Sequence, residues 1–167
     1  RPGGRRGVQA MTTGAGRLEI DGSDLADVLT GSTRNDWFRG RGGNDTISGG
    51  DGFDSLQFNH SRATSGVNVD LAAGTATGTW RGLSFTKTLS GLELVGGTVF
   101  NDTIRGGAAN EELRGIDGDD LLDGRGGNDS LFGSSGNDTL IGGAGNDRLD
   151  AGSGDDRIEV GTATLGG

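Results

Sequence analysis

The sequence predicts an all-β fold in which very short strands stack into a solenoid with two parallel sheets, and three observations lead to this prediction. First, 37 of the 167 residues are glycine and only one is proline. Second, hydrophobic residues make up 30% of the chain and aromatic residues 5%, which is too little for a broad hydrophobic core. Third, from Gly97 onward the chain repeats every nine residues, with an acidic residue at the sixth position and an aliphatic residue at the eighth.

The repeat is clearest in the C-terminal part of the chain, where seven copies follow one another without a break. They read GTVFNDTIR, GGAANEELR, GIDGDDLLD, GRGGNDSLF, GSSGNDTLI, GGAGNDRLD and AGSGDDRIE. Four earlier copies form a separate block and read GSDLADVLT, GSTRNDWFR, GRGGNDTIS and GGDGFDSLQ. Because Asp54 and Asp102 are 48 positions apart, which is not a multiple of nine, the two blocks are in different registers.

Each copy predicts one turn followed by one strand. Positions one to six are rich in glycine, asparagine and aspartate, which favour turns. Asparagine stands at position five in seven copies, and it tolerates a left-handed backbone better than other non-glycine residues, so we expect that conformation there. At positions seven to nine, one aliphatic side chain between mostly polar neighbours predicts a three-residue strand. Two copies then make one 18-residue coil, and stacked coils bury a single aliphatic layer between two sheets.

The chain divides into five parts. Residues 1–20 form a basic arm and residues 161–167 a short tail, whereas 21–57 and 97–160 hold the two repeat blocks. Between the blocks, residues 58–96 alternate apolar with polar residues, which predicts short strands that continue the solenoid or cap its side.

Negative charge is concentrated in the repeat blocks. The chain has 15 basic and 24 acidic residues, and residues 97–160 alone carry a net charge of −9. Such a surface repels nucleic acid and attracts cations. No stretch approaches the ~20 consecutive apolar residues of a membrane span, and the lack of cysteine excludes disulfides and thiolate metal sites. We therefore expect cations as partners, with no nucleic acid and no membrane span.

The repeats resemble the GGxGxDxUx calcium-binding nonapeptide of the RTX (repeats-in-toxin, hemolysin-type) family. GGAGNDRLD is the best match, and GRGGNDSLF and GSSGNDTLI follow closely. The resemblance covers residues 22–57 and 97–160 and implies a right-handed parallel β-roll. It also implies a calcium ion between turns 18 residues apart, held by the position-six carboxylates of both turns and by backbone carbonyls of the turn glycines.

Carried over to this chain, the resemblance gives seven candidate calcium sites. The paired carboxylates are Asp27 with Asp45, Asp36 with Asp54, Asp102 with Asp120, Glu111 with Asp129, Asp120 with Asp138, Asp129 with Asp147, and Asp138 with Asp156. The candidate carbonyl ligands lie around Gly40, Gly43, Gly49, Gly52, Gly115, Gly118, Gly124, Gly127, Gly133, Gly136, Gly142, Gly145, Gly152 and Gly154. The copy GGAANEELR departs from the pattern, so we expect backbone strain at Ala109 and the weakest binding at Glu111.

The ligand chemistry favours calcium independently of the resemblance. Calcium accepts about six to eight oxygen ligands with flexible geometry, whereas softer metals prefer nitrogen or sulfur, for which the chain offers only His60. Two calcium ions would bring residues 21–57 from −4 to zero, and five would bring residues 97–160 from −9 to +1. Because few apolar side chains are available, we expect folding to depend on the ion.

No catalytic motif of the HExxH, GxSxG or Walker type is present, and His60 is expected to be a surface or packing residue. We expect a non-enzymatic, calcium-dependent folding module of a larger bacterial adhesin, toxin or exoenzyme, which the resemblance places outside the cell or on its surface after type I secretion. Two alternatives stay open: a self-assembling surface fibre, and a carbohydrate-binding accessory module of an exoenzyme such as an alginate epimerase. Candidate carbohydrate contacts are Arg34, Trp37, Arg39, Arg125, Arg148 and Arg157.

Overall fold

The computed structural model describes residues 9–12, 17–59 and 62–161, and it contains strands, turns and loops over these ranges. The strands are β1 (Gln9–Thr12), β2 (Leu18–Asp21), β3 (Val28–Thr30), β4 (Trp37–Arg39), β5 (Thr46–Ser48), β6 (Ser55–Gln57), β7 (Asn68–Asp70), β8 (Thr75–Trp80), β9 (Leu83–Ser90), β10 (Leu94–Gly96), β11 (Thr103–Arg105), β12 (Glu112–Asp117), β13 (Leu121–Asp123), β14 (Ser130–Ser135), β15 (Thr139–Ile141), β16 (Arg148–Ser153) and β17 (Arg157–Glu159). Within these ranges no helix is long and apolar enough to cross a membrane. His60 lies outside the described residues.

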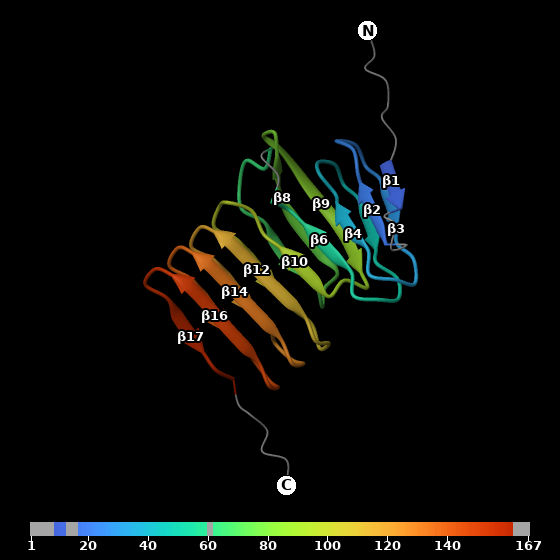
Figure 1. The fold of residues 1–167 in the computed structure, drawn as a ribbon. Coiled ribbons are helices and arrows are strands. Elements are labelled where there is room, and N and C mark those ends of the chain that lie inside the picture. The colour runs from blue at the N-terminus through green and yellow to red at the C-terminus, as the bar shows by residue number, and fades with distance from the viewer. Residues whose placement is uncertain (1–8, 13–16, 60–61, 162–167) are drawn as a thin grey trace.

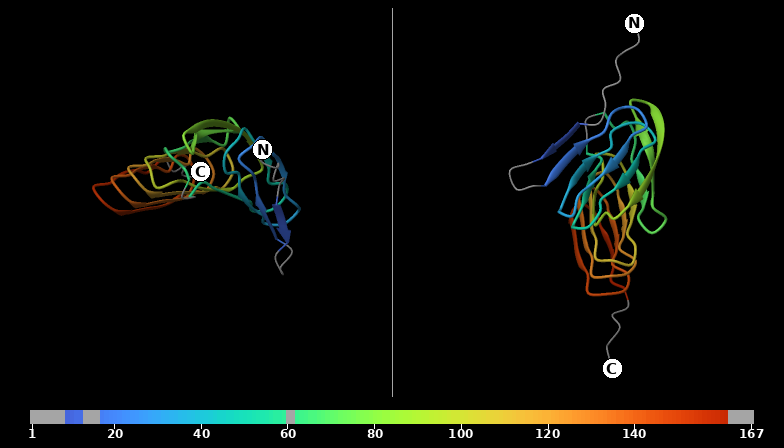
Figure 2. Two further views of the ribbon diagram at one scale, coloured as in Figure 1. Left: turned by 90° about the horizontal axis from the view of Figure 1, so that it is seen from above. Right: turned by 90° about the vertical axis from the view of Figure 1, so that its right-hand side faces the viewer.

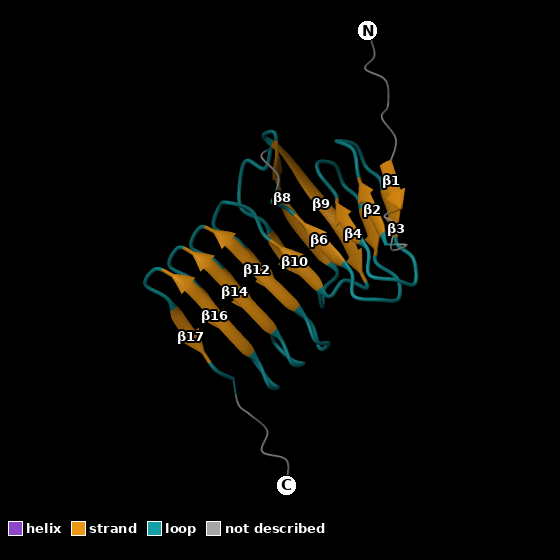
Figure 3. Ribbon diagram, in the orientation of Figure 1, coloured by secondary structure: helices purple, strands orange, loops and turns teal. Residues whose placement is uncertain are grey.

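Two sheets face each other along the length of the molecule (Figures 1 and 3). Sheet A has the order β1-β2-β4-β6-β10-β12-β14-β16, and sheet B has the order β17-β15-β13-β11-β7-β8-β9-β5-β3. From β2 to β16 the strands of sheet A pair in parallel, and within each block the paired residues are 18 positions apart, as in Leu113 with Leu131. The chain therefore forms the predicted parallel β-solenoid, in which turn–strand–turn–strand coils stack on one another.

Most of the core is a row of inward side chains, one from each short strand. In sheet A this row contains Ile20, Phe38, Leu56, Val95, Leu113 and Leu131, and in sheet B it contains Leu29, Ile47, Leu89, Ala76, Val69, Ile104, Leu122 and Leu140. The other buried apolar residues are Phe58, Val67, Trp80, Phe85, Leu92 and Ala151. Most residues on either side of the row are half-buried or exposed, since successive side chains of a strand point to opposite faces. Because this core is a single layer, each coil depends on its neighbours for stability.

The turns use a left-handed backbone at positions two and four. Position four is a glycine with positive φ in most copies, as at Gly136 and Gly145. A Cβ added there would lie 2.0 Å and 1.6 Å, respectively, from a carbonyl oxygen of the preceding coil. Position two also has a positive φ in most copies, including the non-glycine residues Arg41 and Arg125, but not where it is Ser23, Ser32 or Thr98. The close stacking of coils therefore explains why glycine dominates position four.

The left-handed conformation predicted for the position-five asparagines is wrong, because no asparagine among the described residues has a positive φ. These side chains instead connect neighbouring coils. Oδ1 of Asn101 accepts the N–H of Asp119 at 3.0 Å, and Oδ1 of Asn128 accepts the N–H of Asn146 at 2.8 Å. A turn N–H that no strand pairs is thereby satisfied. The strain predicted at Ala109 is also absent, since its φ is not positive.

Residues 58–96 are built into both sheets. β10 lies between β6 and β12 in sheet A, and β7 pairs with β11 in sheet B, all in parallel. β8 and β9 form an antiparallel hairpin that is spliced into sheet B between β7 and β5 (Figure 2, green). Beside it, the rings of Phe58 and Phe85 stack at 6.1 Å between centroids, and both are buried. The hairpin thus interrupts one sheet of the roll and leaves the other continuous.

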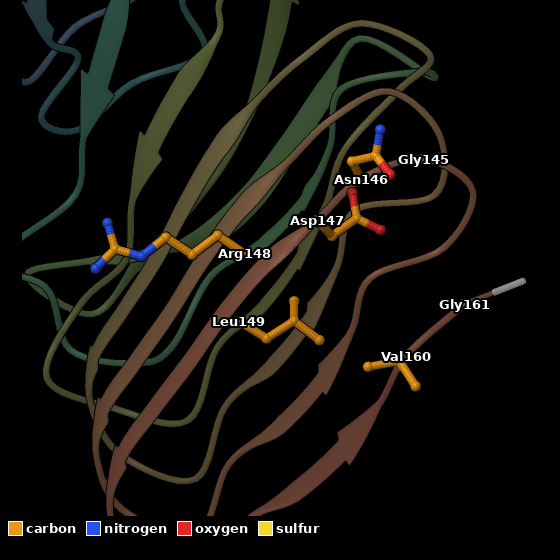
Figure 4. Close-up of a pocket in the computed structure, with 7 residues that line it drawn as sticks. All are labelled: Gly145, Asn146, Asp147, Arg148, Leu149, Val160 and Gly161. Carbon is orange, nitrogen blue, oxygen red and sulfur yellow. The ribbon is translucent and has the colours of Figure 1, made fainter. Parts of the chain in front are cut away.

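The two ends of the roll differ. β1 pairs antiparallel with β2 at one edge of sheet A. At the opposite end, β16 and β17 are edge strands, and Ile158 and Val160 are 50% and 82% exposed. A hollow at this end is lined by Gly145, Asn146, Asp147, Arg148, Leu149, Val160 and Gly161 (Figure 4).

Candidate metal centre

The position-six carboxylates stand in two columns, each residue directly before a strand. Column A precedes the strands of sheet A and contains Asp36, Asp54, Glu93, Glu111, Asp129 and Asp147. Column B precedes the strands of sheet B and contains Asp27, Asp45, Asp102, Asp120, Asp138 and Asp156. Most of these side chains are buried, although Asp27, Glu93, Asp147 and Asp156 are only half-buried.

Within a column, one carboxylate oxygen binds the backbone of the preceding coil. The N–H of Asp120 donates to Oδ1 of Asp138 at 2.8 Å, and the N–H of Asp102 donates to Oδ1 of Asp120 at 2.7 Å. All seven pairs proposed from the sequence make this contact. The structure therefore brings the two residues of every proposed pair together, one coil apart.

The surroundings of the second carboxylate oxygen indicate which of these residues could bind a cation. Five of these oxygens are buried and have no hydrogen-bond partner among the described residues: Asp54 Oδ2, Glu111 Oε2, Asp120 Oδ2, Asp129 Oδ2 and Asp138 Oδ2. A buried carboxylate oxygen is costly unless a hydrogen bond or a positive charge compensates it. Since calcium prefers such hard oxygen ligands, these five oxygens have the chemistry of a calcium site.

Each of these oxygens lies beside the position-one glycine of its own turn. A Cβ built on Gly124 would be 2.5 Å from Asp129 Oδ2 and 2.6 Å from the carbonyl oxygen of Gly142, one coil further on. A Cβ on Gly106 would similarly be 2.9 Å from Glu111 Oε2 and 2.7 Å from the carbonyl oxygen of Gly124. The glycine therefore leaves space between a carboxylate and a carbonyl of adjacent coils. We call this space the cradle, and its oxygens fit calcium.

The glycine carbonyls proposed as ligands from the sequence face different positions of the neighbouring coils. Those that face the position-one glycine of the preceding coil are Gly40, Gly49, Gly115, Gly124 and Gly142. The carbonyls that face position four of the next coil are Gly118, Gly127 and Gly136. Gly43, Gly52, Gly133, Gly145, Gly152 and Gly154 occupy positions one, two and four of the same turns. No three acidic, histidine or cysteine side chains of the described residues converge on one point, so carbonyls are needed to complete a coordination shell.

Burial makes these carboxylates hard to ionise without a cation. Desolvation raises the pKa of Asp120 to about 7 and that of Glu111 to about 7, although backbone hydrogen bonds oppose the shift. Desolvation also raises the pKa of Asp54, Asp102, Asp129 and Asp138. Neighbouring carboxylates add to the shift at Asp120, as two like charges in one column repel each other. A bound cation would compensate both effects.

Three carboxylates accept hydrogen bonds from a serine or threonine at position two of the same turn. The backbone N–H of Ser23 donates to Oδ2 of Asp27 at 2.5 Å. The N–H of Ser32 donates in the same way to Asp36 at 2.5 Å, and that of Thr98 to Asp102 at 2.6 Å. The hydroxyl of Ser23 also donates to Asp27 Oδ2, at 2.9 Å. The first carboxylates of both blocks therefore have protein partners for the oxygen that is orphaned in the interior coils.

Glu93 is a column residue that sequence reasoning missed. It directly precedes β10, and its Oε2 accepts the backbone N–H of Asp54 at 2.8 Å, as the aspartates do elsewhere. Column A therefore continues through the insert. The signal was present in the sequence, because Glu93 lies two coil halves, or 18 positions, before Glu111.

Lys87, the one lysine of the chain, is the second residue that sequence reasoning missed. It stands at position six of column B, since it precedes the part of β9 in which Thr88 pairs with Thr46. Its ammonium forms a fully buried ion pair with Asp45. Desolvation raises the pKa of Asp45 to about 6 and lowers that of Lys87, and the ion pair opposes both shifts. The sequence signal is TLSG after Lys87, which resembles TISG after Asp45.

The residues considered for carbohydrate binding do not form one track. Arg34 and Arg125 lie in turns, Trp37 and Arg39 on β4 and Arg148 on β16 of sheet A, and Arg157 on β17 of sheet B. The Trp37 ring lies 5.1 Å from the Arg39 guanidinium, and Arg125 forms a two-pronged ion pair with Asp70 at 2.8 and 2.7 Å. Trp37, Arg39, Arg125 and Arg157 therefore contact one another or neighbouring carboxylates, and Arg148 lies over the Phe132 ring.

Comparison with known families gives one match. A family model of the RTX calcium-binding nonapeptide repeat, which describes four copies, matches residues 21–56, 96–131 and 132–162. These ranges make up more than half of the chain. No curated protein matches it.

Proposed function

Because the chain belongs to the family of RTX calcium-binding repeat proteins, we propose that it is a non-catalytic module whose two repeat blocks fold around calcium ions held in the two carboxylate columns. The observation that carries this proposal is the set of five buried carboxylate oxygens without a partner among the described residues. Four of them, from Glu111 to Asp138, recur at nine-residue intervals, and all five lie beside a position-one glycine, as a repeated ion site requires.

The ligands that we propose follow from the columns. Asp54, Glu111, Asp120, Asp129 and Asp138 supply the inward oxygens, and the position-one carbonyls of the next coil face the same cradles. The half-buried Asp147 and Asp156 complete the pairs at the open end. Calcium would supply positive charge between carboxylates that otherwise repel each other, and this energy would contribute directly to folding.

We also propose that the chain is part of a larger bacterial protein that leaves the cell unfolded by type I secretion and folds outside it. Two features support this setting. Calcium sites of extracellular modules bind with a Kd of about 0.1–1 mM, so they stay empty where calcium is scarce. The absence of cysteine also lets the chain fold outside the cell without disulfide formation.

The test is a calcium titration followed by far-ultraviolet circular dichroism and amide hydrogen exchange. We expect a spectrum of a disordered chain in a chelator, and β structure with protected amides at millimolar calcium. Magnesium at the same concentration is the control and should not substitute, because it keeps its water and demands octahedral geometry. Full β content and full amide protection in the chelator would refute the proposal.

A second candidate function, self-assembly, is favoured by the edge that β16 and β17 form among the described residues. The edge strands β16 and β17 end beside exposed Ile158 and Val160 and the hollow of Figure 4. Unpaired parallel edges invite the addition of further strands. Light scattering in calcium should then show mass that grows with protein concentration, and Ile158→Arg should reduce this growth. A constant monomer mass would exclude this candidate.

A further inference from the structure

We propose that the ammonium group of Lys87 takes the place of a calcium ion at Asp45, so that column B of the first block carries a built-in cation. This inference rests on the proposed function, since it assigns one of the family's ion positions to a side chain of the protein. It differs from the expectation from the sequence, in which Asp27 and Asp45 form a calcium site.

The oxygens around the ammonium group are those of an ion site. Nζ of Lys87 pairs with Asp45 Oδ2 and donates to the carbonyl oxygen of Gly43 at 3.0 Å, and the carbonyl oxygen of Gly42 lies at 3.5 Å. Oδ1 of Asp45 accepts the N–H of Asp27 at 2.9 Å, as in the other six proposed pairs. Asp45 therefore differs from the orphaned carboxylates only in that its second oxygen already has a positive partner.

The lysine side chain also fills the cradle. A Cβ built on Gly40 would lie 3.2 Å from Asp45 Oδ2 and 3.0 Å from Cε of Lys87. At Gly31, by comparison, the added Cβ would lie 2.0 Å from the carbonyl oxygen of Gly49. The methylene chain of Lys87 thus stands where other coils present a carbonyl, and the space for an ion is taken.

The hairpin closes this site from outside. Lys87 has no exposed surface, and its Nζ lies 4.5 Å from the centroid of the Phe85 ring. Trp80 covers the turn, because a Cβ on Gly42 would lie 2.7 Å from Trp80 Cδ1. The Trp80 indole donates to Asp24 at 2.8 Å. A charge buried in this way is tolerated only when it is paired, so the Lys87–Asp45 pair is a fixed part of the fold.

Asp27, the other member of the proposed pair, also has protein partners for its second oxygen. Its Oδ2 accepts both the N–H and the hydroxyl of Ser23. Neither carboxylate of column B in the first block therefore requires an ion. The position where the hairpin interrupts sheet B is the position where the protein supplies its own positive charge.

The test counts calcium ions bound per chain at saturating calcium by equilibrium dialysis with metal analysis, with circular dichroism as the check of folding. The variant Asp45→Asn combined with Lys87→Met removes both charges and keeps both sizes. We expect it to bind as many ions as the natural chain. One ion fewer would overturn the inference, because Asp45 would then be a calcium ligand.

A second variant tests the cradle in the opposite direction. Lys87→Ala removes the ammonium and its methylenes, which leaves Asp45 Oδ2 and two turn carbonyls facing a space, and we expect one additional calcium ion. Lys87→Met, the matched control, fills the space and should add none. A folded Lys87→Ala chain with the natural ion count would also overturn the inference. If the natural chain itself bound no calcium, the proposed function would fail instead.

Discussion

Asp54 donates its backbone N–H to Oε2 of Glu93 at 2.8 Å, across 39 positions of sequence. The contact joins the last coil of the first block to the residue before β10, at the end of the insert, and Asp54 is completely buried. We therefore expect Glu93→Ala to destabilise the calcium-loaded protein by about 1–3 kcal/mol, the cost of an unpaired buried donor. Glu93→Gln, which keeps an acceptor oxygen, should cost less. Urea unfolding at saturating calcium measures both changes.

The matched control is Glu112→Ala. The Glu112 carboxylate pairs with Arg114 on the outer face of the roll, and exposed ion pairs contribute only about 0–1 kcal/mol. Equal losses of unfolding free energy for Glu93→Ala and Glu112→Ala would contradict the role given to Glu93.

Interior carboxylates should matter more than terminal ones. Asp129 and Asp138 each belong to two proposed pairs and are buried, whereas Asp156 belongs to one and is half-buried at the open end. We expect Asp129→Ala or Asp138→Ala to shift the calcium midpoint of folding further than Asp156→Ala, because an interior loss breaks the stack in two. Circular dichroism during calcium titration gives the midpoints. Identical shifts at interior and terminal positions would rule out the stacked-pair arrangement.

The Glu111–Asp129 site should be the weakest in the second block. Burial raises the pKa of Glu111 to about 7, and the charge of Asp129 adds to the shift. Shortening the side chain in Glu111→Asp, combined with Ala109→Gly, should tighten binding at this site by about threefold, or ~0.7 kcal/mol. Calorimetric titration with calcium measures this change. The single change Ala109→Gly is the control and should do little, as Ala109 has no positive φ to relieve. A restored repeat that binds no tighter would show that glutamate is an equivalent ligand.

The effect of pH on folding should have opposite signs with and without calcium. In the metal-free fold, desolvation raises the pKa of Asp120 to about 7, above its ordinary value of 3.8. The folded state therefore binds protons more tightly than the unfolded state, and its stability is greatest at low pH and falls as pH rises toward 7. Calcium needs the ionised carboxylates, so its apparent affinity should rise over the same range. The stability of the fold is measured between pH 4 and pH 8, once in a chelator and once in calcium. A stability that changed in the same direction with pH under both conditions would contradict the prediction.

Much of the roll could be predicted because the residue types within each nonapeptide predict one turn and one strand. Leu131 lies between polar neighbours after a glycine-rich turn, and the structure buries it in a short strand opposite Leu113 and Leu149. The fixed spacing also predicted which carboxylates meet, as for Asp120 and Asp138. A strict repeat in one dimension leaves few alternatives for the stacking of coils.

The rest depended on contacts between coils and on the insert. Asn101 has the preferences of a left-handed residue, yet its side chain accepts a hydrogen bond from the next coil, and this contact decides its conformation. The structure places Lys87 and Glu93 in the columns because β9 pairs with β5 and β10 pairs with β6. A search for carboxylates at nine-residue intervals cannot find a lysine in the same place, although it does reach Glu93, nine positions before Asp102.

The hairpin also shows where this architecture tolerates extra chain. β9 pairs with β5 with Leu89 beside Ile47, and β7 pairs with β11 with Val69 beside Ile104. On both sides of the hairpin, sheet B therefore keeps the parallel pairing that aligns its core residues. At the outer tip, a Cβ on Gly82 would touch nothing within 4 Å. Foreign peptide grafted at Gly82 would therefore project away from the stack, which makes the hairpin a natural handle for labels, tethers or displayed epitopes.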